Sequence, residues 1–247
     1  MPLPSRSAVV PVVAVFVVAC VSFVGCSKEK SDAMRVAPTA AASASAGQKR
    51  LNVTGGTATF LIDAPLEKIK GQSTKFRGSI DVDPNNLKAS RGQIEVDLDD
   101  LKTETFDDQE KNKAQTGHAK NWFEIGTDVE AKRREENRWA RFTIKSIDEA
   151  SAEKPTGGTP ITIKATGDLW LHGVSAPKTV SATVTFAGPP EAPTLMRIVT
   201  AEPVRISLKE HDVKPRDLAG KFLSGALEKI GQKIDDSVLI SLDLTAM

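Results

Sequence analysis

The side chains best able to do chemistry are few and widely separated along the chain. Its three histidines, His118, His172 and His211, have no other metal ligand at the short spacings that are typical of zinc sites. Its two cysteines, Cys20 and Cys26, both fall in the first apolar stretch, which excludes zinc fingers, iron-sulfur clusters, cysteine nucleophiles and disulfide scaffolds. The sequence therefore predicts no metal site and no cofactor.

Three carboxylates, Asp97, Asp99 and Asp100, are close enough in sequence to suggest paired groups for general acid and base catalysis. Asp97 and Asp99 would share the solvent face of a strand and Asp100 would begin the turn, so a solvated acidic edge is expected. His172 beside Gly173 could act as a base, but no serine or cysteine nucleophile accompanies it. We expect a hydrogen bond that stabilises the turn there, and no enzymatic activity.

The composition predicts a folded protein without a nucleic-acid partner. The chain has 247 residues, and 33 basic against 32 acidic side chains leave a formal charge of +1. No strongly basic block occurs along it, so phosphate contacts to a nucleic acid are not expected. Apolar residues make up 40% of the chain and aromatic residues 5%, which is enough for a hydrophobic core.

The N-terminal residues resemble a bacterial lipoprotein signal. The run from Ala8 to Gly25 carries no charge. Its length of about 18 residues borders on that of a membrane-spanning helix, so an uncleaved anchor or an ordinary signal stays open on length alone. Phe23-Val24-Gly25-Cys26 is similar to a lipobox, which implies cleavage before Cys26 and acylation of its thiol and amine. We therefore expect residues 1–25 to be a signal peptide and the mature protein to be lipid-anchored in the periplasm, at the inner or the outer membrane.

The next segment, residues 26–56, predicts a flexible tether. It is small and polar, and it contains the run AAASASAG from Ala40 to Gly47. Alanine favours a helix, but the serines and the glycine weaken that tendency, and no apolar face is available to bury. We expect this tether to hold a folded domain, residues 57–247, away from the bilayer.

The folded domain shows an alternation of apolar and polar residues with a period of two, which places alternate side chains on opposite faces of a sheet. Turn residues separate about eight such segments, and short connections favour antiparallel neighbours. The segments are Thr59–Ile62, Phe76–Val82, Ile94–Leu98, Ala140–Ile144, Ile161–Leu171, Val180–Phe186, Val204–Leu208 and Val238–Leu244. The fold class is therefore all-β. Eight one-faced strands can form a sandwich or a closed barrel, and periodicity does not choose between them.

Two segments depart from the strand pattern. Residues Asp217 to Ile234 place their apolar side chains on one stripe at helical spacing, with Asp217 as the N-cap, which predicts an amphipathic helix. This helix could cover an end or edge of the sheet, act as a lid over a cavity, or contact a membrane. Residues Gln109 to Ile125 predict a short helix or loop that docks Trp122 and Phe123.

Several of these segments together resemble the YceI-like family. The stretch from Gly167 to Lys178 is similar to the family's G-x-L-x-L-H-G-V-T-x-P hairpin, which is the most specific of its motifs. Ile94 to Thr103 resembles its acidic strand, and His118 followed by Trp122-Phe123 resembles its histidine and paired-aromatic segment. Asp236 to Leu242 suits its last strand. The resemblance covers the whole predicted domain, from residue 57 to residue 247.

The sequence departs from the family pattern at two places. Ser207 to Val213 stands where the family often has an arginine-containing segment that runs into a Phe-Gly pair, and Trp122 replaces the first of two phenylalanines. These changes leave the strand scaffold intact, but the identity of the ligand need not be the same.

The resemblance implies an extended, lipocalin-like barrel of eight antiparallel strands with helical elements, which encloses a polyisoprenoid or a related amphiphile for sequestration or transport. Such a chain has no hydrogen-bonding groups, so an apolar inner face would suit it. The residues expected to line this tunnel are Phe76, Ile80, Phe142, Ile144, Leu169, Leu171, Val184 and Phe186. The alternative is a packed barrel without a small ligand, whose outer face or predicted helix meets a partner in the envelope.

Overall fold

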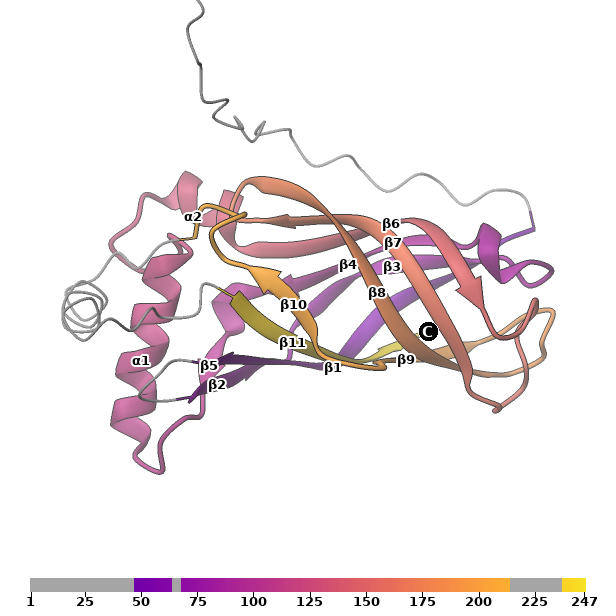
Figure 1. The fold of residues 1–247 in the computed structure, drawn as a ribbon, viewed down its shortest axis with the longest axis horizontal. Coiled ribbons are helices and arrows are strands. Elements are labelled where there is room, and N and C mark those ends of the chain that lie inside the picture. The colour runs from indigo at the N-terminus through magenta and orange to yellow at the C-terminus, as the bar shows by residue number, and fades with distance from the viewer. Residues whose placement is uncertain (1–46, 64–67, 214–236) are drawn as a thin grey trace, which may run out of the picture. The chain divides into compact units, whose positions relative to one another are not determined.

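The computed structural model describes residues 47–63, 68–213 and 237–247, and the structural statements below refer to these residues. They form an antiparallel β-structure with two α-helices and two short 3-10 helices (Figure 1). The strands are β1 (Lys49–Asp63), β2 (Lys68–Ser73), β3 (Phe76–Val82), β4 (Arg91–Asp97), β5 (Lys102–Thr103), β6 (Trp139–Ala150), β7 (Ile161–Leu171), β8 (Val174–Ala187), β9 (Leu195–Thr200), β10 (Val204–Ser207) and β11 (Ser237–Ala246). The helices are η1 (Leu87–Ala89), η2 (Leu98–Asp100), α1 (Gln109–Trp122) and α2 (Ala131–Asn137).

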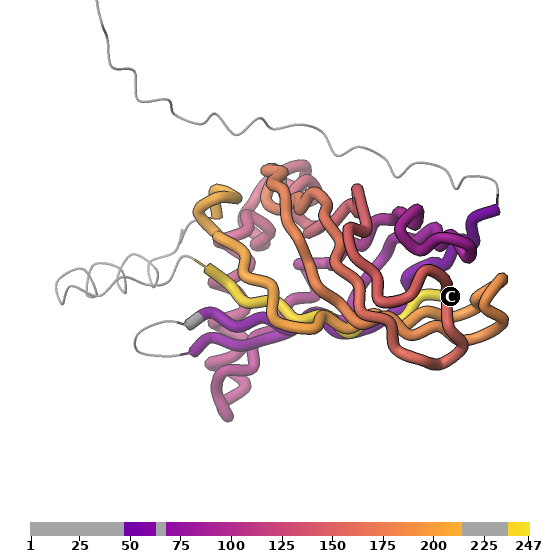
Figure 2. Tube along the Cα trace, turned by 45° about the vertical axis from the view of Figure 1, so that its right-hand side comes forward, coloured from indigo at the N-terminus to yellow at the C-terminus, as the bar shows by residue number. Residues whose placement is uncertain are grey.

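The strands close into a barrel, which settles the choice that periodicity left open. The sheet order is β10-β11-β9-β8-β7-β6-β4-β3-β1-β2-β5, and β11 also pairs with β1. Strand β2 leads into β3 through two residues, β4 into β5 through η2, and β9 into β10 through three residues, so the eleven described segments make eight lengths of strand. Figure 2 shows the first strand beside the last, which closes the ring. The predicted eight-stranded, all-β, lipocalin-like barrel is confirmed.

Apolar side chains gather in two separate clusters inside this barrel. The first apolar cluster lies at the end where the chain terminates, around Leu51, Ile161 and Leu244. The second apolar cluster lies at the end that carries α1 and α2 (left in Figure 1), around Ile125 and Leu171. Each cluster is built from the inward-facing residues of several strands, because alternate side chains of a strand point to the same face.

The outer face of the barrel holds ion pairs that are more buried than the alternation predicts. Glu95 on β4 is only 4% exposed, and it accepts hydrogen bonds from Arg141 Nε at 2.6 Å and from Arg77 Nε. The Arg77 guanidinium lies over the Trp139 ring, 3.7 Å from its centroid. Burial alone would raise the pKa of Glu95, but the bonds from the two arginines outweigh it and hold the pKa below its ordinary value. These contacts join β3, β4 and β6 from outside.

Glycines allow the strands to bend sharply around the barrel. Gly78 on β3 has φ +123°, a value that side chains rarely tolerate, and a Cβ there would collide with the carbonyl oxygen of Gln93 on the next strand. At Gly167 on β7, a Cβ would lie 2.9 Å from Cζ of Phe142, whose ring covers the glycine. The close approach of neighbouring strands at these two positions therefore requires glycine.

Several element boundaries differ from the predicted ones. Strand β1 begins at Lys49, so residues 49–56 belong to the barrel and not to the tether. Gly55-Gly56 suggests the beginning of a strand, but here the pair lies inside one, next to an irregularity in the β1–β11 register. The segment 109–125 is mostly the helix α1, and α2, β2 and β9 have no predicted counterpart.

Two predicted elements lie outside the described residues: the N-terminal signal and tether up to residue 46, and the amphipathic helix of residues 217–234. Among the residues that are described, no helix is both long enough and apolar enough to cross a membrane.

Candidate functional site

The eight predicted lining residues all lie on the inner face of the barrel, but the structure does not bring them into one place. Four of them belong to the first apolar cluster: Phe76, Ile80, Val184 and Phe186. Three belong to the second apolar cluster: Phe142, Leu169 and Leu171. The eighth, Ile144, belongs to neither cluster. Five of the eight are buried, whereas Phe76, Phe142 and Ile144 remain partly exposed.

The inner face between the two clusters has small residues on most strands. Gly92 pairs with Ile144 from β4, and Gly167 pairs with it from β7, so this isoleucine stands between two glycines. Other small inward-facing residues at this level are Ala58, Gly78, Ala165 and Ala182. Ile163, Ile198 and Leu242, which pack against the first apolar cluster, also face inward and are only partly buried.

This combination of small and partly exposed side chains has a direct consequence for the interior. An inward-facing apolar residue in a solidly filled barrel is expected to be fully buried, because native cores are close-packed. Ile144 and its inward-facing neighbours are instead only partly buried, which indicates that this part of the inner face is not close-packed. The middle of the barrel is therefore the candidate binding site for an apolar chain, and Ile144 lies at its centre.

A polar network at the helix-bearing end of the barrel joins four parts of the chain. Glu124 Oε2, just after α1, accepts hydrogen bonds from Arg133 Nε at 2.7 Å and from Asn137 Nδ2 at 3.4 Å, both on α2. It also lies 3.0 Å from His172 Nε2, and because a carboxylate can only accept, that nitrogen must donate. His172 Nδ1 lies 3.3 Å from the carbonyl oxygen of His211, which follows β10. We call these five residues the Glu124 network.

The two histidines of the Glu124 network are fully enclosed. His172 is 1% exposed and His211 is 0% exposed. His172 and Gly173 form a two-residue hairpin in which both residues have positive φ, +51° and +79°, as the tight turn between antiparallel strands requires. The predicted hydrogen bond of His172 is present, but it joins distant segments and does not stay within the turn.

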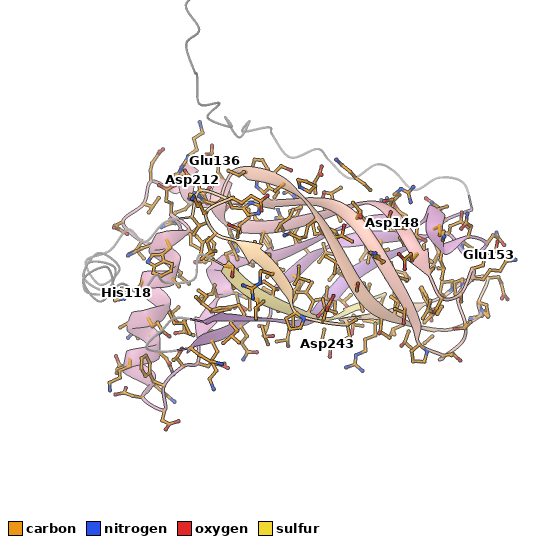
Figure 3. The ribbon with its side chains drawn as sticks, in the orientation of Figure 1. His118, Glu136, Asp148, Glu153, Asp212 and Asp243 are labelled. Atoms are coloured by element: carbon orange, nitrogen blue, oxygen red, sulfur yellow. The ribbon has the colours of Figure 1, made fainter. Side chains whose placement is uncertain are left out.

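Unusual backbone conformations gather around the same network. Three residues other than glycine have positive φ among the described residues: Glu124 (+54°), His172 (+51°) and Asp212 (+55°). Each such residue costs of the order of 1 kcal/mol or more and persists only where its surroundings hold it. Figure 3 shows Asp212 and Glu136 of α2 at this end of the barrel, far from Asp148 and Glu153 at the other end. The network therefore fixes the helices to the barrel at a defined place.

The three candidate catalytic carboxylates do not form a pair. Asp97 is 2% exposed and forms a two-pronged ion pair with Arg138, at 2.9 and 2.7 Å, so the prediction of a solvated edge is wrong for it. Strand β4 ends at Asp97, and η2 takes the chain away from the strand face that Asp99 was predicted to share. Asp100 accepts hydrogen bonds from the amide and the hydroxyl group of Thr74. The sequence pattern failed here because Arg138 is 41 residues away from Asp97.

The described residues also contain no group of three or more histidine, cysteine, aspartate or glutamate side chains that could hold a metal ion. His118 lies on α1, and His172 and His211 meet through a backbone carbonyl, not through a shared ligand position. The convergence of His172 with His211 and Glu124 was not predicted. The sequence signal that was available is the His172-Gly173 turn, where a residue other than glycine must adopt positive φ.

Burial of His211 predicts how stability depends on pH. Desolvation lowers the pKa of this imidazole below its ordinary value, because the charged form is disfavoured inside the protein. In the unfolded chain the ring takes up a proton as the pH falls past about 6.5, whereas the folded ring stays neutral to lower pH. The unfolded state then binds more protons, so this group lowers the free energy of unfolding as the pH falls from 7.5 to 5.5.

The variant His211→Asn tests this dependence, because the asparagine Nδ2 can replace Nδ1 as donor to the carbonyl oxygen of Val174. Urea titrations at pH 5.5, 6.5 and 7.5 should give a flatter pH dependence for the variant, by up to about 1.4 kcal/mol per pH unit. His118 and His172 are present in both proteins, so their titration cancels in the comparison. Equal slopes in the two proteins would contradict the assignment.

The closed antiparallel barrel of eight strand lengths defines the class of protein: a lipocalin-like barrel. The chain belongs to the YceI-like domain family, whose sequence model matches residues 49–246. A comparison with curated proteins finds no significant match.

Solved structures from three bacteria are similar to this chain. The chain is similar to a polyisoprenoid binding domain from Saccharophagus degradans implicated in plant cell wall breakdown, with 12% identity, a TM-score of 0.53, and 79% of this chain and 97% of that chain covered. It matches BcnA of Burkholderia cenocepacia at 18% identity and a TM-score of 0.47, over 78% of this chain and 96% of that one. It matches the YceI protein of Campylobacter jejuni at 14% identity and a TM-score of 0.46, over 71% and 82%. At such identities the first of these likenesses supports the fold alone.

Proposed function

We propose that the protein binds a polyisoprenoid or a similar amphiphilic chain inside its barrel, for sequestration or transport, and does not catalyse a reaction. The observation that carries this proposal is the middle of the barrel, where Ile144 stands between Gly92 and Gly167 and remains partly exposed. Membership of the YceI-like family and the likeness to a polyisoprenoid binding domain support the choice of ligand class.

The affinity for such a chain would come from shape and burial. Removal of apolar surface from water contributes roughly 25 cal/mol for each square ångström, so a long hydrocarbon chain is strongly driven out of solvent. A bilayer is an equally apolar competitor, and transfer from the membrane therefore gains little hydrophobic free energy. Exchange between barrel and membrane should be easy, which suits carriage better than permanent storage.

Organic extraction of the purified protein tests the proposal. The full chain is produced in a bacterial host, solubilised from the membranes and purified, and the organic extract of the folded protein is analysed by mass spectrometry. We expect a stoichiometric amount of one long-chain lipid. An extract without lipid, together with a filled interior in an experimental structure, would overturn the proposal and favour the alternative of an envelope interaction module.

We also propose that the protein is exported to the periplasm and anchored there through acylated Cys26. The support is the apolar run that ends at Cys26 and the similarity of Phe23 to Cys26 to a lipobox. A single acyl chain gives only marginal binding, so stable anchoring requires the several chains that a lipoprotein cysteine carries.

A labelled fatty acid measures this modification directly. Cells that express the full chain should incorporate the label into it, and the variant Cys26→Ala should lose the label completely. The variant Cys20→Ala is the matched control and should keep it. Label that persists in Cys26→Ala, or label that is lost only in Cys20→Ala, would place the modification elsewhere.

A further inference from the structure

Residues 174–181 of β8 have no partner among the described strands on the side that faces β10. Residues Ala182 to Ala187 of β8 pair with β9, whereas β10 pairs with β11 alone among the described strands. The amide of Ala201 donates to the carbonyl oxygen of Ser181, and beyond that hydrogen bond β8 and β10 diverge toward the helix-bearing end of the barrel (Figure 1). Pro177 lies among residues 174–181, the part of β8 without a partner on this side. Proline is expected at an unpaired strand edge, because it has no N–H group to leave unsatisfied. We call this place the β8–β10 gap.

The charged residue Lys178 lies on the inner face of the barrel next to the β8–β10 gap. It pairs with Gly167 of β7, and its neighbours two residues away on β8, Ala176 and Val180, pair with inward-facing Leu169 and Ala165. Because alternate residues of a strand share a face, Lys178 stands in a row of apolar and small residues. A lysine in such a row must direct its ammonium group to a polar partner or to water.

The partner that the structure provides is only a backbone carbonyl. Lys178 Nζ donates to the carbonyl oxygen of Arg205 on β10, at 3.0 Å, so the side chain reaches across the gap. Within the described part of the chain, no carboxylate lies within 4.0 Å of this ammonium group. Lys178 itself is partly buried, and at this place solvent still reaches it.

Lysines on the outer face of the neighbouring strands β6 and β7 are paired differently. Lys145 Nζ lies 2.6 Å from Asp168 Oδ2, and Lys164 Nζ lies 3.2 Å from Glu149 Oε1. The outer face of this sheet thus provides each of these two lysines with a carboxylate, whereas the inner face leaves Lys178 with a neutral acceptor. A full negative charge beside Lys178 would form the stronger, charge-assisted hydrogen bond.

We propose that Lys178 binds the anionic head group, a phosphate or a carboxylate, of the amphiphile whose chain lies in the barrel. This inference rests on the proposed function. The head group would stay at the β8–β10 gap, where water reaches it, while the chain extends from Lys178 along the small residues Gly167 and Ala165 toward Ile144. A few placed polar groups of this kind commonly fix the orientation of a ligand in an otherwise apolar pocket.

Paired probes that differ only in charge test the proposal. The affinities of the delipidated protein are measured for geranylgeranyl monophosphate against geranylgeraniol, and for cis-parinaric acid against the corresponding alcohol. We expect at least one of the anions to bind about tenfold or more tightly than its alcohol, as a charge-assisted hydrogen bond predicts. Tighter binding of the monophosphate than of geranylgeraniol would identify the head group as a phosphate. Tighter binding of cis-parinaric acid than of its alcohol would identify the head group as a carboxylate.

Three variants at two positions connect this preference to Lys178. Lys178→Met keeps the length of the side chain and should bring the affinities for anion and alcohol to within about threefold, with the alcohol affinity unchanged. Lys178→Arg should keep the preference, and Lys164→Met on the outer face of β7 should leave it intact. Thermal melts of all three variants establish that each is folded.

Three outcomes would overturn the inference. If wild-type protein binds each alcohol as tightly as its anion, the head-group site is wrong while the proposed function stands. If Lys178→Met keeps the preference, another group binds the anion, and Lys178 only closes the gap. If none of the probes and no extracted lipid binds to the wild-type protein, both the proposed function and this inference fail.

Discussion

Replacement of Ile144 by tryptophan is expected to prevent the proposed lipid from binding in the barrel. The indole ring would enter the inner face between Gly92 and Gly167, which is not close-packed, and would occupy the space that an apolar chain needs. We expect the lipid recovered by organic extraction to fall by at least about tenfold. Because Ile144 is partly exposed and not enclosed in a filled core, the free energy of unfolding should fall by less than about 1 kcal/mol, below the cost that overpacking of a filled core would cause.

The neighbouring residue gives a matched control for this experiment. Lys145 follows Ile144 on the same strand, points to the opposite face and is exposed. The variant Lys145→Trp should therefore keep the wild-type amount of lipid, although it loses its surface ion pair with Asp168. An Ile144→Trp protein that is folded and still yields as much lipid as Lys145→Trp would show that the chain binds elsewhere. A large loss of stability in Ile144→Trp would show that the interior is filled.

Removal of the carboxylate of Glu124 is expected to cause the largest loss of stability of any single change considered. Glu124→Ala would leave the buried His172 ring and the Arg133 guanidinium without their shared acceptor. Arg133 is partly exposed and can be solvated, and a neutral His172 can donate through Nδ1 to the carbonyl oxygen of His211 instead, so part of the loss is offset. We expect the free energy of unfolding to fall by about 2–3 kcal/mol. Urea titration at pH 7.5 measures this loss.

Glu136 provides the comparison for Glu124. It lies on α2, is exposed, and points away from the barrel end (Figure 3). Glu136→Ala should change the free energy of unfolding by no more than about 0.5 kcal/mol. A Glu124→Ala variant as stable as Glu136→Ala would show that the Glu124 network contributes no net stability, for instance because its desolvation cost equals its gain.

The barrel could be predicted wherever one face of a strand is apolar and the other polar. Ile161 to Leu171 alternates over eleven residues, and the structure has β7 over that same range. The prediction missed β2 (KIKGQS), where lysines and a glycine interrupt the alternation, and β9 (LMRIVT), where apolar residues fall on both faces. The predicted first strand also begins too late, because two successive glycines suggest the entry to a strand. In the structure, the strand β1 continues through Gly56, which has φ +147°.

Less of the candidate site could be predicted, because it depends on residues that are far apart in the sequence. The alternating pattern predicted that Ile144 faces the inside of the barrel. It did not predict that two glycines lie beside Ile144, because this depends on the register between strands. Glu124 and His172 are 48 residues apart, and no periodic pattern connects a helix end to a hairpin. Lys178 did carry a signal: it stands in phase with the apolar residues of its strand.

The β8–β10 gap also decides how this barrel responds to lateral force. Around the rest of the ring, neighbouring strands are joined by ladders of backbone hydrogen bonds, and parting them would break several at once. Among the described residues, β8 and β10 share no ladder of backbone hydrogen bonds, and Lys178 reaches across to the carbonyl oxygen of Arg205 instead, so parting these two strands breaks fewer backbone hydrogen bonds. The barrel thus has a seam along part of its length. If the proposed hydrocarbon chain enters there, it would pass sideways between two strands and would not thread through either end of the barrel.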